Sequence, residues 1–431
     1  MVGLIDCDNF FCSCERVFRP DLERKPLVVL SNNDGCIVAR SKEVKAMGLK
    51  ECMPYYQLVR DYPDAGIVAF SSNYELYGDM SARVMAILGE EVPEIMQYSI
   101  DEAFLNLEGM RTDDMKGWGE ALCRKVQRST GLPVSLGIAS TKTLAKLATH
   151  FAKRYPGYNK CCVIADEYQR ERALRLSDIG DVWGIGRHMC RRLDYYGIKS
   201  AYDFTERSRH WIRSKFHVTG ERTWCELRGE NAIGWDEVEG AAKKSILTSR
   251  SFPGMITDVE DLKSHVANYA ARCAAKLRRQ KSACALVKVF VSSNRFREDL
   301  PQYGGEAFYT FATPTDTTME IVNAATKMVE TIYREGICYK RAGVMVDGLT
   351  PADVLQPDLF SYDPDRRKKQ QAVSATLDSI NGALGADTVV LGAQQYRQQD
   401  ASGGRITFVN AIRRALKSPN YSTSMDALTV R

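Results

Sequence analysis

Two acidic stretches of the chain place carboxylates among apolar neighbours, where they could hold a hard metal ion. Asp6 follows the apolar residues 2–5, and Asp101 and Glu102 stand side by side in YSIDEAF, residues 98–104. A buried carboxylate tends to take up a proton, so several of them near pH 7 need a compensating cation. Oxygen ligands without His or Cys favour Mg²⁺ over Zn²⁺. Two such ions could activate an attacking oxygen and stabilise a leaving one.

The sequence also leaves a simpler interpretation of the adjacent acids open. Asp101 and Glu102 could end a β-turn and face water, since Asp and Glu are mostly exposed. The apolar flanks and the similar setting of Asp6 argue against this, but sequence patterns alone do not bring Asp6 to Asp101. Asp8 lies two positions after Asp6, on the same face of a regular strand, which makes it a tempting further ligand.

The acidic stretches lie among segments that alternate between strand-like and helix-like patterns. This mixture, with antiparallel pairing inside residues 94–109, predicts an α+β domain. Gly48 and Gly131 are expected to close two of the helices. Strands are expected within residues 3–11, 26–31, 94–109 and 133–140, and helices within 41–48, 72–92, 118–131 and 141–155.

The second half of the chain shows two further regions. Residues 168–230 are expected to be a compact helical region whose turn GIG, Gly184 to Gly186, has the form of a helix-hairpin-helix. In that motif, backbone N–H groups at the turn approach a DNA phosphate, and Arg187 follows directly. Residues 231–242 are expected to be a linker, and residues 243–348 alternate strand, helix and strand.

Charge is distributed unevenly along the chain. Residues 243–300 hold twelve Lys or Arg against five Asp or Glu, whereas the net charge of the whole chain is +5. A basic domain in a near-neutral chain suggests a polyanionic partner. The alternative for the run AAKLRRQK is a solvated helix face.

The composition limits the class of protein. A chain of 431 residues with 44% hydrophobic and 26% charged residues is typical of a soluble globular protein of several domains. No apolar run reaches the ~18–20 residues of a membrane span, and the N-terminus lacks the basic region of a signal peptide. The thirteen cysteines show no zinc spacing, so we expect reduced, mostly buried thiols in a cytoplasmic protein without a membrane partner.

Six blocks of sequence, in one order along the chain, resemble the Y-family translesion DNA polymerases. They are DCDNFFCSCE, NNDGCIVARSKEVKAMGL, SSNYELYGDMS, YSIDEAFLNLEG, GIASTKTLAKLA and DVWGIGRHMCRRL. The resemblance covers essentially the whole chain and implies a right-hand polymerase with an α/β little finger. The domains that it implies are a palm (1–9 and 75–165), fingers (10–74), a thumb (168–230), a linker (231–242), a little finger (243–348) and a C-terminal extension that binds the clamp and partners (349–431).

The resemblance also implies a catalytic site in the palm. Asp6, Asp101 and Glu102 would hold two Mg²⁺ ions, with the backbone carbonyl of Cys7 as a further ligand. A primer 3′-OH would then attack the α-phosphorus of a deoxynucleoside triphosphate, and pyrophosphate would leave. The family pattern does not require an acid at Asp8, which is therefore left out of this ligand set.

Other residues receive roles from the same resemblance. Phe11 would be the steric gate that excludes the ribose 2′-OH, whereas Phe10 would be a core residue. The candidate nucleotide contacts are Lys42, Lys45 and Lys146 for the triphosphate, with Cys36 and Val38 over the nascent base pair. The family often has Tyr and Arg in place of Lys42 and Lys45, and Lys does not reproduce an Arg fork. Lys142 is expected to be only a solvated helix residue.

The implied partners are nucleic acid and protein. Gly184, Gly186 and Arg187 would hold phosphates of the primer–template DNA, and the basic region would grip both strands. The segment QPDLF resembles a sliding-clamp peptide, with Gln356, Leu359 and Phe360 as its contacts; the alternative is local packing. Residues 361–431 would engage a processed UmuD-like dimer and a RecA filament.

These inferences predict error-prone, template-directed DNA synthesis past lesions in the SOS response. One alternative is a nucleotide cyclase or nuclease with a palm-like carboxylate site, which the hairpin motif and Phe11 disfavour. Another is a non-catalytic module that binds DNA and recruits the clamp to stalled forks, which the intact Asp6, Asp101 and Glu102 disfavour.

Overall fold

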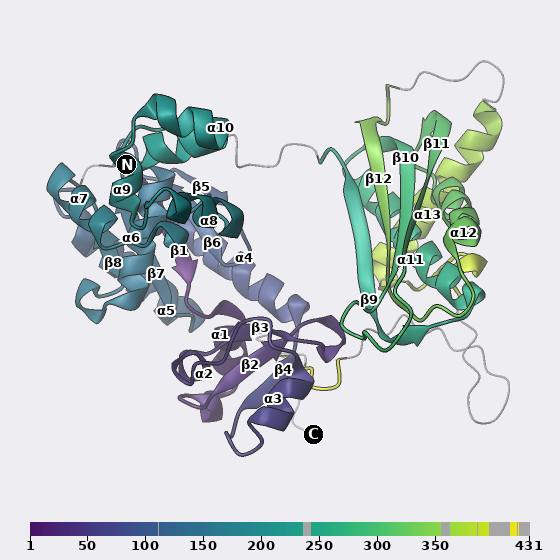
Figure 1. Cartoon of the computed structure of the whole chain (residues 1–431), viewed down its shortest axis with the longest axis horizontal. Coiled ribbons are helices and arrows are strands. Elements are labelled where there is room, and N and C mark those ends of the chain that lie inside the picture. Colours follow the sequence, from purple (N-terminus) through teal and green to yellow (C-terminus); the bar gives the residue numbers. More distant parts are fainter. Residues whose placement is uncertain are drawn as a thin grey trace. The chain divides into compact units, whose positions relative to one another are not determined.

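The protein, described here from a computed structural model, divides into two compact units (Figure 1). One consists of Met1–Ala241 together with the segment that begins at Arg414, and the other of Ala242–Arg413. The structure describes residues 1–110, 112–235, 243–354, 363–385, 387–395, 414–419 and 421. The predicted α+β class is confirmed, because each unit is built from both β-strands and α-helices.

A five-stranded sheet forms the centre of the first unit, in the order β5-β6-β1-β7-β8. Its strand β1 pairs antiparallel with both neighbours, β6 and β7. Strands β5 and β6 also pair antiparallel, which confirms the antiparallel pair predicted within residues 94–109. The strands are β1 (Val2–Cys7), β5 (Glu94–Gln97), β6 (Glu102–Asn106), β7 (Val134–Ala139) and β8 (Cys161–Val163).

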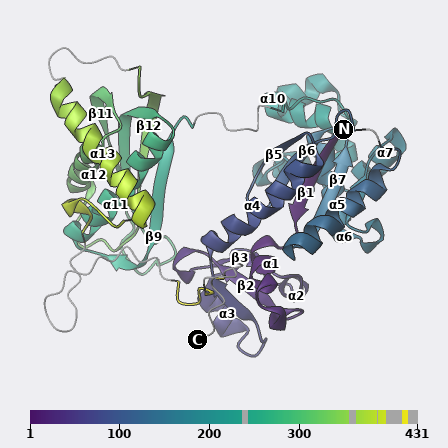
Figure 2. The same ribbon diagram turned by 180° about the vertical axis from the view of Figure 1, so that it is seen from behind.

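Helices cover both faces of this sheet. Ile5 and Leu105 point to the face covered by α4 (Tyr74–Glu91) and α5 (Met115–Thr130), which lie across it in Figure 2. Leu4 and Phe104 point to the opposite face, covered by α6 (Lys142–Arg154). Since side chains alternate along a strand, Asp6 belongs to the α6 face as Leu4 does.

Close contact between α6 and the sheet depends on Gly137 in β7. A Cβ added there would lie 2.2 Å from the Ala145 carbonyl oxygen and 2.2 Å from the Thr149 nitrogen. The helix therefore rests directly on the strand backbone. The Thr149 hydroxyl donates to the Leu4 carbonyl at 2.8 Å, which ties α6 to β1 as well.

A smaller three-stranded sheet follows β1 in the chain. It has the order β3-β2-β4, with β2 antiparallel to β3 and parallel to β4. Asn9 allows the turn from β1 into α1, because its φ of 50° is left-handed, a conformation that Asn tolerates. The elements here are α1 (Phe10–Val17), β2 (Leu27–Leu30), β3 (Ile37–Arg40), α2 (Lys42–Ala46), α3 (Tyr55–Asp61) and β4 (Val68–Ser71).

The helical region after β8 contains the predicted hairpin. Gly184, with a φ of 89°, makes the turn, and Gly186 is the N-cap of α8. A 3₁₀ turn, Ile179–Asp181, precedes the hairpin turn. The helices are α7 (Glu167–Arg175), α8 (Arg187–Tyr195), α9 (Ala201–Thr205) and α10 (Arg209–Leu227).

The second unit is a four-stranded antiparallel sheet in the order β11-β10-β12-β9. Helices α11 and α12 pack on one of its faces around Val266, Val289 and Val344. Its elements are β9 (Ile246–Ile256), α11 (Val259–Arg279), β10 (Ser282–Ser293), β11 (Gly304–Thr315), α12 (Thr318–Ile332), β12 (Tyr339–Pro351) and α13 (Pro364–Leu384). The last strand thus ends at Pro351, beyond residue 348, where the little finger was expected to end.

The structure corrects the expected linker at its start. Residues 231–235 pack against the first unit, because Glu226 accepts hydrogen bonds from the Ala232 and Ile233 backbone nitrogens. The Lys142 ammonium donates to the carbonyls of Ile233 and Gly234 at 3.0 and 2.7 Å. Lys142 is therefore buried, and the expectation of a solvated helix residue was wrong.

The cysteines are free, and nine of the thirteen are buried, as the sequence predicted. Burial raises the pKa of thiols such as Cys7 and Cys14, which keeps them protonated. Among the helices of the described part of the chain, none is both long and apolar enough to cross a membrane.

Acid should destabilise the second unit through His265. This ring packs against Phe252, with centroids 4.5 Å apart and planes tilted by 45°, and burial, helped by Arg250, lowers its pKa from 6.5 to about 3. The unfolded chain then binds a proton below pH 6.5 that the folded chain does not. We expect the free energy of unfolding to fall by about 1.4 kcal/mol per pH unit between pH 6 and 4 because of this residue. Thermal melts of wild type and His265→Gln over this range should differ in slope; parallel slopes would contradict the assignment.

Candidate active site

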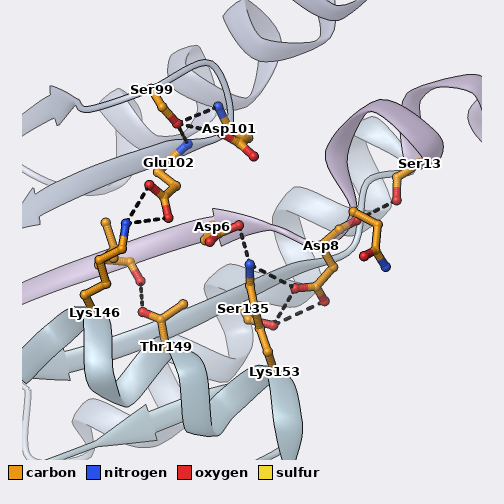
Figure 3. A network of polar contacts seen from close by, with 12 residues as sticks. Asp6, Asp8, Ser13, Ser99, Asp101, Glu102, Ser135, Lys146, Thr149 and Lys153 are labelled. Atoms are coloured by element: carbon orange, nitrogen blue, oxygen red, sulfur yellow. Dashed lines mark hydrogen bonds and ion pairs between the residues drawn. The ribbon is translucent and has the colours of Figure 1, made fainter. Parts of the chain in front are cut away.

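The antiparallel register of β1 and β6 brings two of the predicted acids together. Asp6 pairs directly with Glu102, on the sheet face that α6 covers. Ser135 of β7 is the neighbour of Asp6 on the other side. Figure 3 shows these side chains gathered at the ends of the three central strands. Residues far apart in the sequence thus share one polar site.

Helix α6 supplies two lysines to these acids. The Lys146 ammonium lies 2.9 and 2.8 Å from the two Glu102 carboxylate oxygens. Lys153, two helical turns later, forms an ion pair with Asp6. Both side chains lie on the helix face toward the sheet, beside Thr149 (Figure 3). Lys146 was expected here from the sequence and Lys153 was not, although the spacing of seven residues between them was a usable signal.

Asp101 belongs to the turn that precedes β6. Its backbone carbonyl accepts from the Cys7 nitrogen at 2.9 Å, which joins the turn to the end of β1. Its carboxylate accepts from the Ser99 hydroxyl at 2.6 Å, and that hydroxyl also accepts from the Asp101 and Glu102 backbone nitrogens. Ser99 therefore fixes the turn that places the adjacent acids, a role that the sequence analysis missed.

The two paired carboxylates titrate differently. Burial, opposed by Lys153 and aided by the neighbouring Glu102 carboxylate, raises the pKa of Asp6 to about 7. Burial also favours a higher pKa for Glu102, but its hydrogen bonds with Asp6 and Lys146 outweigh burial and lower the pKa. The raised pKa of Asp6 shows that its charged form is disfavoured in this site, and a bound cation would favour that form.

Asp8 does not join this pair. Its carboxylate accepts from the Ser135 hydroxyl at 3.0 Å and from Lys160 at 2.7 Å, and Lys153 lies 3.9 Å away. These contacts hold Asp8 on the side of β7 and β8.

The donor set fits a hard divalent cation. Asp6, Glu102 and Asp101 offer carboxylate oxygens near the end of β1, and the raised pKa of the Cys7 thiol leaves only its carbonyl as a donor. In the described residues, no three His, Cys, Asp or Glu side chains converge as a metal-holding cluster. The Asp101 carboxylate points to Ser99 instead, so the three-acid site stays a prediction.

Phe11 and Phe10 occupy different surroundings at the start of α1. Phe10 is a buried core residue, with 3% of its surface exposed. Phe11 is partly exposed and stacks on Tyr77, with ring centroids 4.4 Å apart and planes at 17°, while Tyr74 meets it edge-on. The ring of Phe11 is therefore held by α4 close to the end of β1.

The candidate nucleotide contacts differ in their surroundings. The Lys45 ammonium donates to the Asn9 side chain at 2.5 Å, and burial followed by repulsion from Lys153 lowers its pKa. Lys42 is exposed on the same short helix. Cys36 lies just before β3, where Ser31 contacts its backbone nitrogen and its thiol, and Val38 of β3 packs against the main core.

The hairpin region contacts the acidic turn through aromatic side chains. The Trp183 indole donates to the Tyr98 hydroxyl at 3.1 Å, and the two rings meet edge-on. Lys146 lies over the Tyr98 ring at 5.0 Å. Trp183 directly precedes Gly184, so the predicted DNA-binding turn is connected to the residues around Glu102. Gly186 and Arg187 are exposed at the start of α8.

The expected clamp peptide is not part of the described chain. Gln356, Leu359 and Phe360 are outside the described residues, as is much of the expected partner-binding region 361–431. The described parts of that region divide between the two units. Helix α13 belongs to the second unit, and the segment from Arg414 belongs to the first.

Comparison with known proteins identifies the family. Residues 5–150 match the impB/mucB/samB family, and residues 243–359 match the C-terminal domain of the same family. The protein UmuC of Salmonella typhimurium is 41% identical over 98% of both chains. MucB of Escherichia coli is 35% identical over 100% of this chain and 99% of its own. The chain belongs to the impB/mucB/samB family of Y-family DNA polymerases. The expected resemblance is confirmed.

The fold agrees with this family. A solved Y-family DNA polymerase chimera of Dbh and Dpo4 superposes with a TM-score of 0.63 at 21% identity, over 81% of this chain and 98% of its own. Residues 371–430 match a domain of unknown function. Y-family membership implies use of divalent metal ions, in agreement with the oxygen donors around Asp6 and Glu102.

Proposed function

We propose that this Y-family member is an error-prone, template-directed DNA polymerase that extends primers past lesions as part of an SOS response. The pairing of Asp6 with Glu102 across β1 and β6, under the lysines of α6, carries the proposal. The family membership supports it, because the matched residues 5–150 include Asp6, Asp101, Glu102 and Lys146.

The proposed domains follow the expected right hand. The five-stranded sheet with α4, α5 and α6 serves as the palm, and the three-stranded sheet as the fingers. The helical region is the thumb, whose turn at Gly184, Gly186 and Arg187 contacts duplex phosphates. The four-stranded unit is the little finger. Its face opposite α11 and α12 carries Lys288 and Arg341, suited to sequence-independent DNA contacts.

Asp6, Asp101, Glu102 and the Cys7 carbonyl are the proposed holders of two Mg²⁺ ions. When bound, such ions lower the pKa of a primer 3′-OH and neutralise charge on the triphosphate. The chain's own contribution is the arrangement of the ligands. Ser99 fixes the acidic turn, and Lys146 and Lys153 balance the carboxylates beside the place where a triphosphate would bind.

Primer extension tests this function. The full chain is incubated with a primer annealed to a template that carries an abasic site, with deoxynucleoside triphosphates and Mg²⁺, and with or without the accessory dimer and RecA. Products that grow by single nucleotides past the lesion support the proposal. Cleaved or cyclised nucleotide products would favour the nuclease or cyclase. Clamp binding without any incorporation would favour the recruiting module.

The proposed protein partners are the sliding clamp through Gln356, Leu359 and Phe360, and a processed UmuD-like dimer and a RecA filament through residues 361–431. The similarity to UmuC supports these proposals. Pull-down with each partner separately, using the full chain and a variant with Leu359 and Phe360 changed to alanine, separates clamp binding from the other interactions.

Lys45 and Lys42 form a matched pair for testing triphosphate binding. Both lysines are exposed on α2, but the Lys45 ammonium donates to the Asn9 side chain, and desolvation and repulsion from Lys153 lower its pKa. We expect Lys45→Ala to raise KM for deoxynucleotides about tenfold, the scale of one lost charged contact. Lys42→Ala should change KM little. Steady-state single-nucleotide incorporation measures both; equal effects would contradict the distinction.

A further inference from the structure

A short C-terminal segment, described at residues 414–419 and 421, is bound to the first unit beside the end of β4 and the start of α4. Its backbone adds to β4, because the Ser71 nitrogen donates to the Leu416 carbonyl at 3.1 Å and the Leu416 nitrogen donates to the Ser71 hydroxyl at 2.9 Å. At the far end, the Tyr421 ring stacks on Phe18, with centroids 4.5 Å apart and planes at 5°.

The centre of the segment enters a buried polar cluster. Ser418 is only 4% exposed, and its hydroxyl contacts the Asn73 amide at 2.9 Å and the Glu15 carboxylate at 3.2 Å. The same Glu15 oxygen accepts from the Tyr77 hydroxyl at 2.8 Å. Glu15 is fully buried, and burial raises its pKa, while the hydrogen bonds from Tyr77 and Ser418 favour its charged form.

This cluster touches the proposed steric gate through Tyr77. The Tyr77 ring stacks on Phe11, and its hydroxyl bonds to Glu15. Tyr74, the second ring against Phe11, lies under the Arg414 guanidinium at 6.0 Å. The two rings that hold Phe11 are therefore both linked to the C-terminal segment. Tyr74 contacts the segment itself, and Tyr77 contacts Glu15, to which the segment binds.

We propose that this segment, through residues 414–419 and Tyr421, braces the sugar-selecting ring Phe11, with Ser418, Glu15 and Tyr77 as positioning residues. Releasing the segment frees Tyr77 and Tyr74 to shift, which moves the ring against which the sugar is checked. The inference rests on the proposed polymerase function and on Phe11 as its gate. It also gives part of the domain of unknown function a role, contact with the nucleotide-selecting region.

The test compares sugar selection in the full-length protein. Single-nucleotide incorporation gives kcat/KM for a deoxynucleotide and for the matching ribonucleotide, and their ratio is the readout. In the double variant Ser418→Ala with Tyr421→Ala, we expect the ratio to fall about tenfold, the effect of one lost hydrogen bond to a buried charged group. Tyr77→Phe, which keeps the ring but loses the bond to Glu15, should lower the ratio in the same direction.

Two controls separate bracing from general damage. Lys417→Ala removes an ion pair of the segment with Glu75, at 3.3 Å, that does not touch Glu15 or Phe11. Tyr421→Phe keeps the ring stack on Phe18. Both should keep the wild-type ratio. A ratio that stays constant in the double variant, with both rates or the melting temperature lowered, would show a merely structural role and overturn the inference.

The outcomes also separate this inference from the proposals beneath it. If the double variant and Tyr77→Phe keep the ratio while Phe11→Ala admits ribonucleotides, the brace is wrong and the gate stands. If Phe11→Ala also leaves the ratio unchanged, the gate itself is wrong. If the wild-type chain extends no primer, the proposed function fails before either.

Discussion

Replacing Asp101 with alanine should abolish nucleotide incorporation and leave binding to primer–template DNA intact. The loss of one proposed metal ligand removes several kcal/mol of transition-state stabilisation, and each 1.4 kcal/mol is tenfold in rate, so we expect a drop of about a thousandfold or more. DNA binding depends mainly on phosphate contacts made elsewhere, which this change leaves in place. Single-turnover extension and fluorescence anisotropy measure the two quantities.

A matched control lies on the adjacent strand. Glu94 is a carboxylate of β5 that accepts from the Asn106 amide at the opposite end of the β5–β6 pair. Glu94→Ala should retain incorporation near the wild-type rate. Substantial synthesis by Asp101→Ala, or an equal loss in both variants, would remove Asp101 from the proposed catalytic set.

Phe11→Ala should admit ribonucleotides. The ring is partly exposed and held by Tyr77 and Tyr74, so it can act as a wall against a 2′-OH. Removing it should lower the preference for deoxynucleotides about a hundredfold, the scale of a clash of roughly 3 kcal/mol. Competition between a deoxynucleotide and its ribonucleotide in primer extension gives this ratio.

The neighbouring Phe10 provides the contrast for that experiment. It is buried in the core, so Phe10→Ala should cost about 3–5 kcal/mol of stability. The fraction of the Phe10→Ala variant that remains folded should keep the wild-type preference for deoxynucleotides over ribonucleotides. If Phe10→Ala relaxed sugar selection while Phe11→Ala did not, the assignment of the two rings would be reversed.

The local elements were predictable because their signals are local. Gly131 closes α5 with a left-handed φ of 75°, and Gly48 follows α2 with a φ of 76°. The strand–turn–strand pattern around Asp101 predicted the β5–β6 pair. Once β1 joins that pair in antiparallel register, strand alternation places Asp6 beside Glu102.

The remainder depended on tertiary contacts that the sequence does not encode locally. The approach of α6 to β7 requires a missing side chain at Gly137, and only this approach brings Lys153 to Asp6. Lys142 was expected in water because lysines usually are, but the carbonyls of Ile233 and Gly234 offer it acceptors. The binding of Ser418 to Glu15 joins residues 403 positions apart, beyond the reach of any periodicity.

The path of the chain between the two units has a consequence for their covalent linkage. The polypeptide leaves the first unit once and returns to it with the segment from Arg414, so the four-stranded unit is an insertion rather than an appendage. The entropic cost of closing such a loop grows only slowly with its length, so a long insertion adds little to the cost of folding. A single proteolytic nick between residues 235 and 243 would remove the covalent link between the two fragments, but the contacts of the returning segment with Ser71, Asn73 and Glu15 would still join them non-covalently.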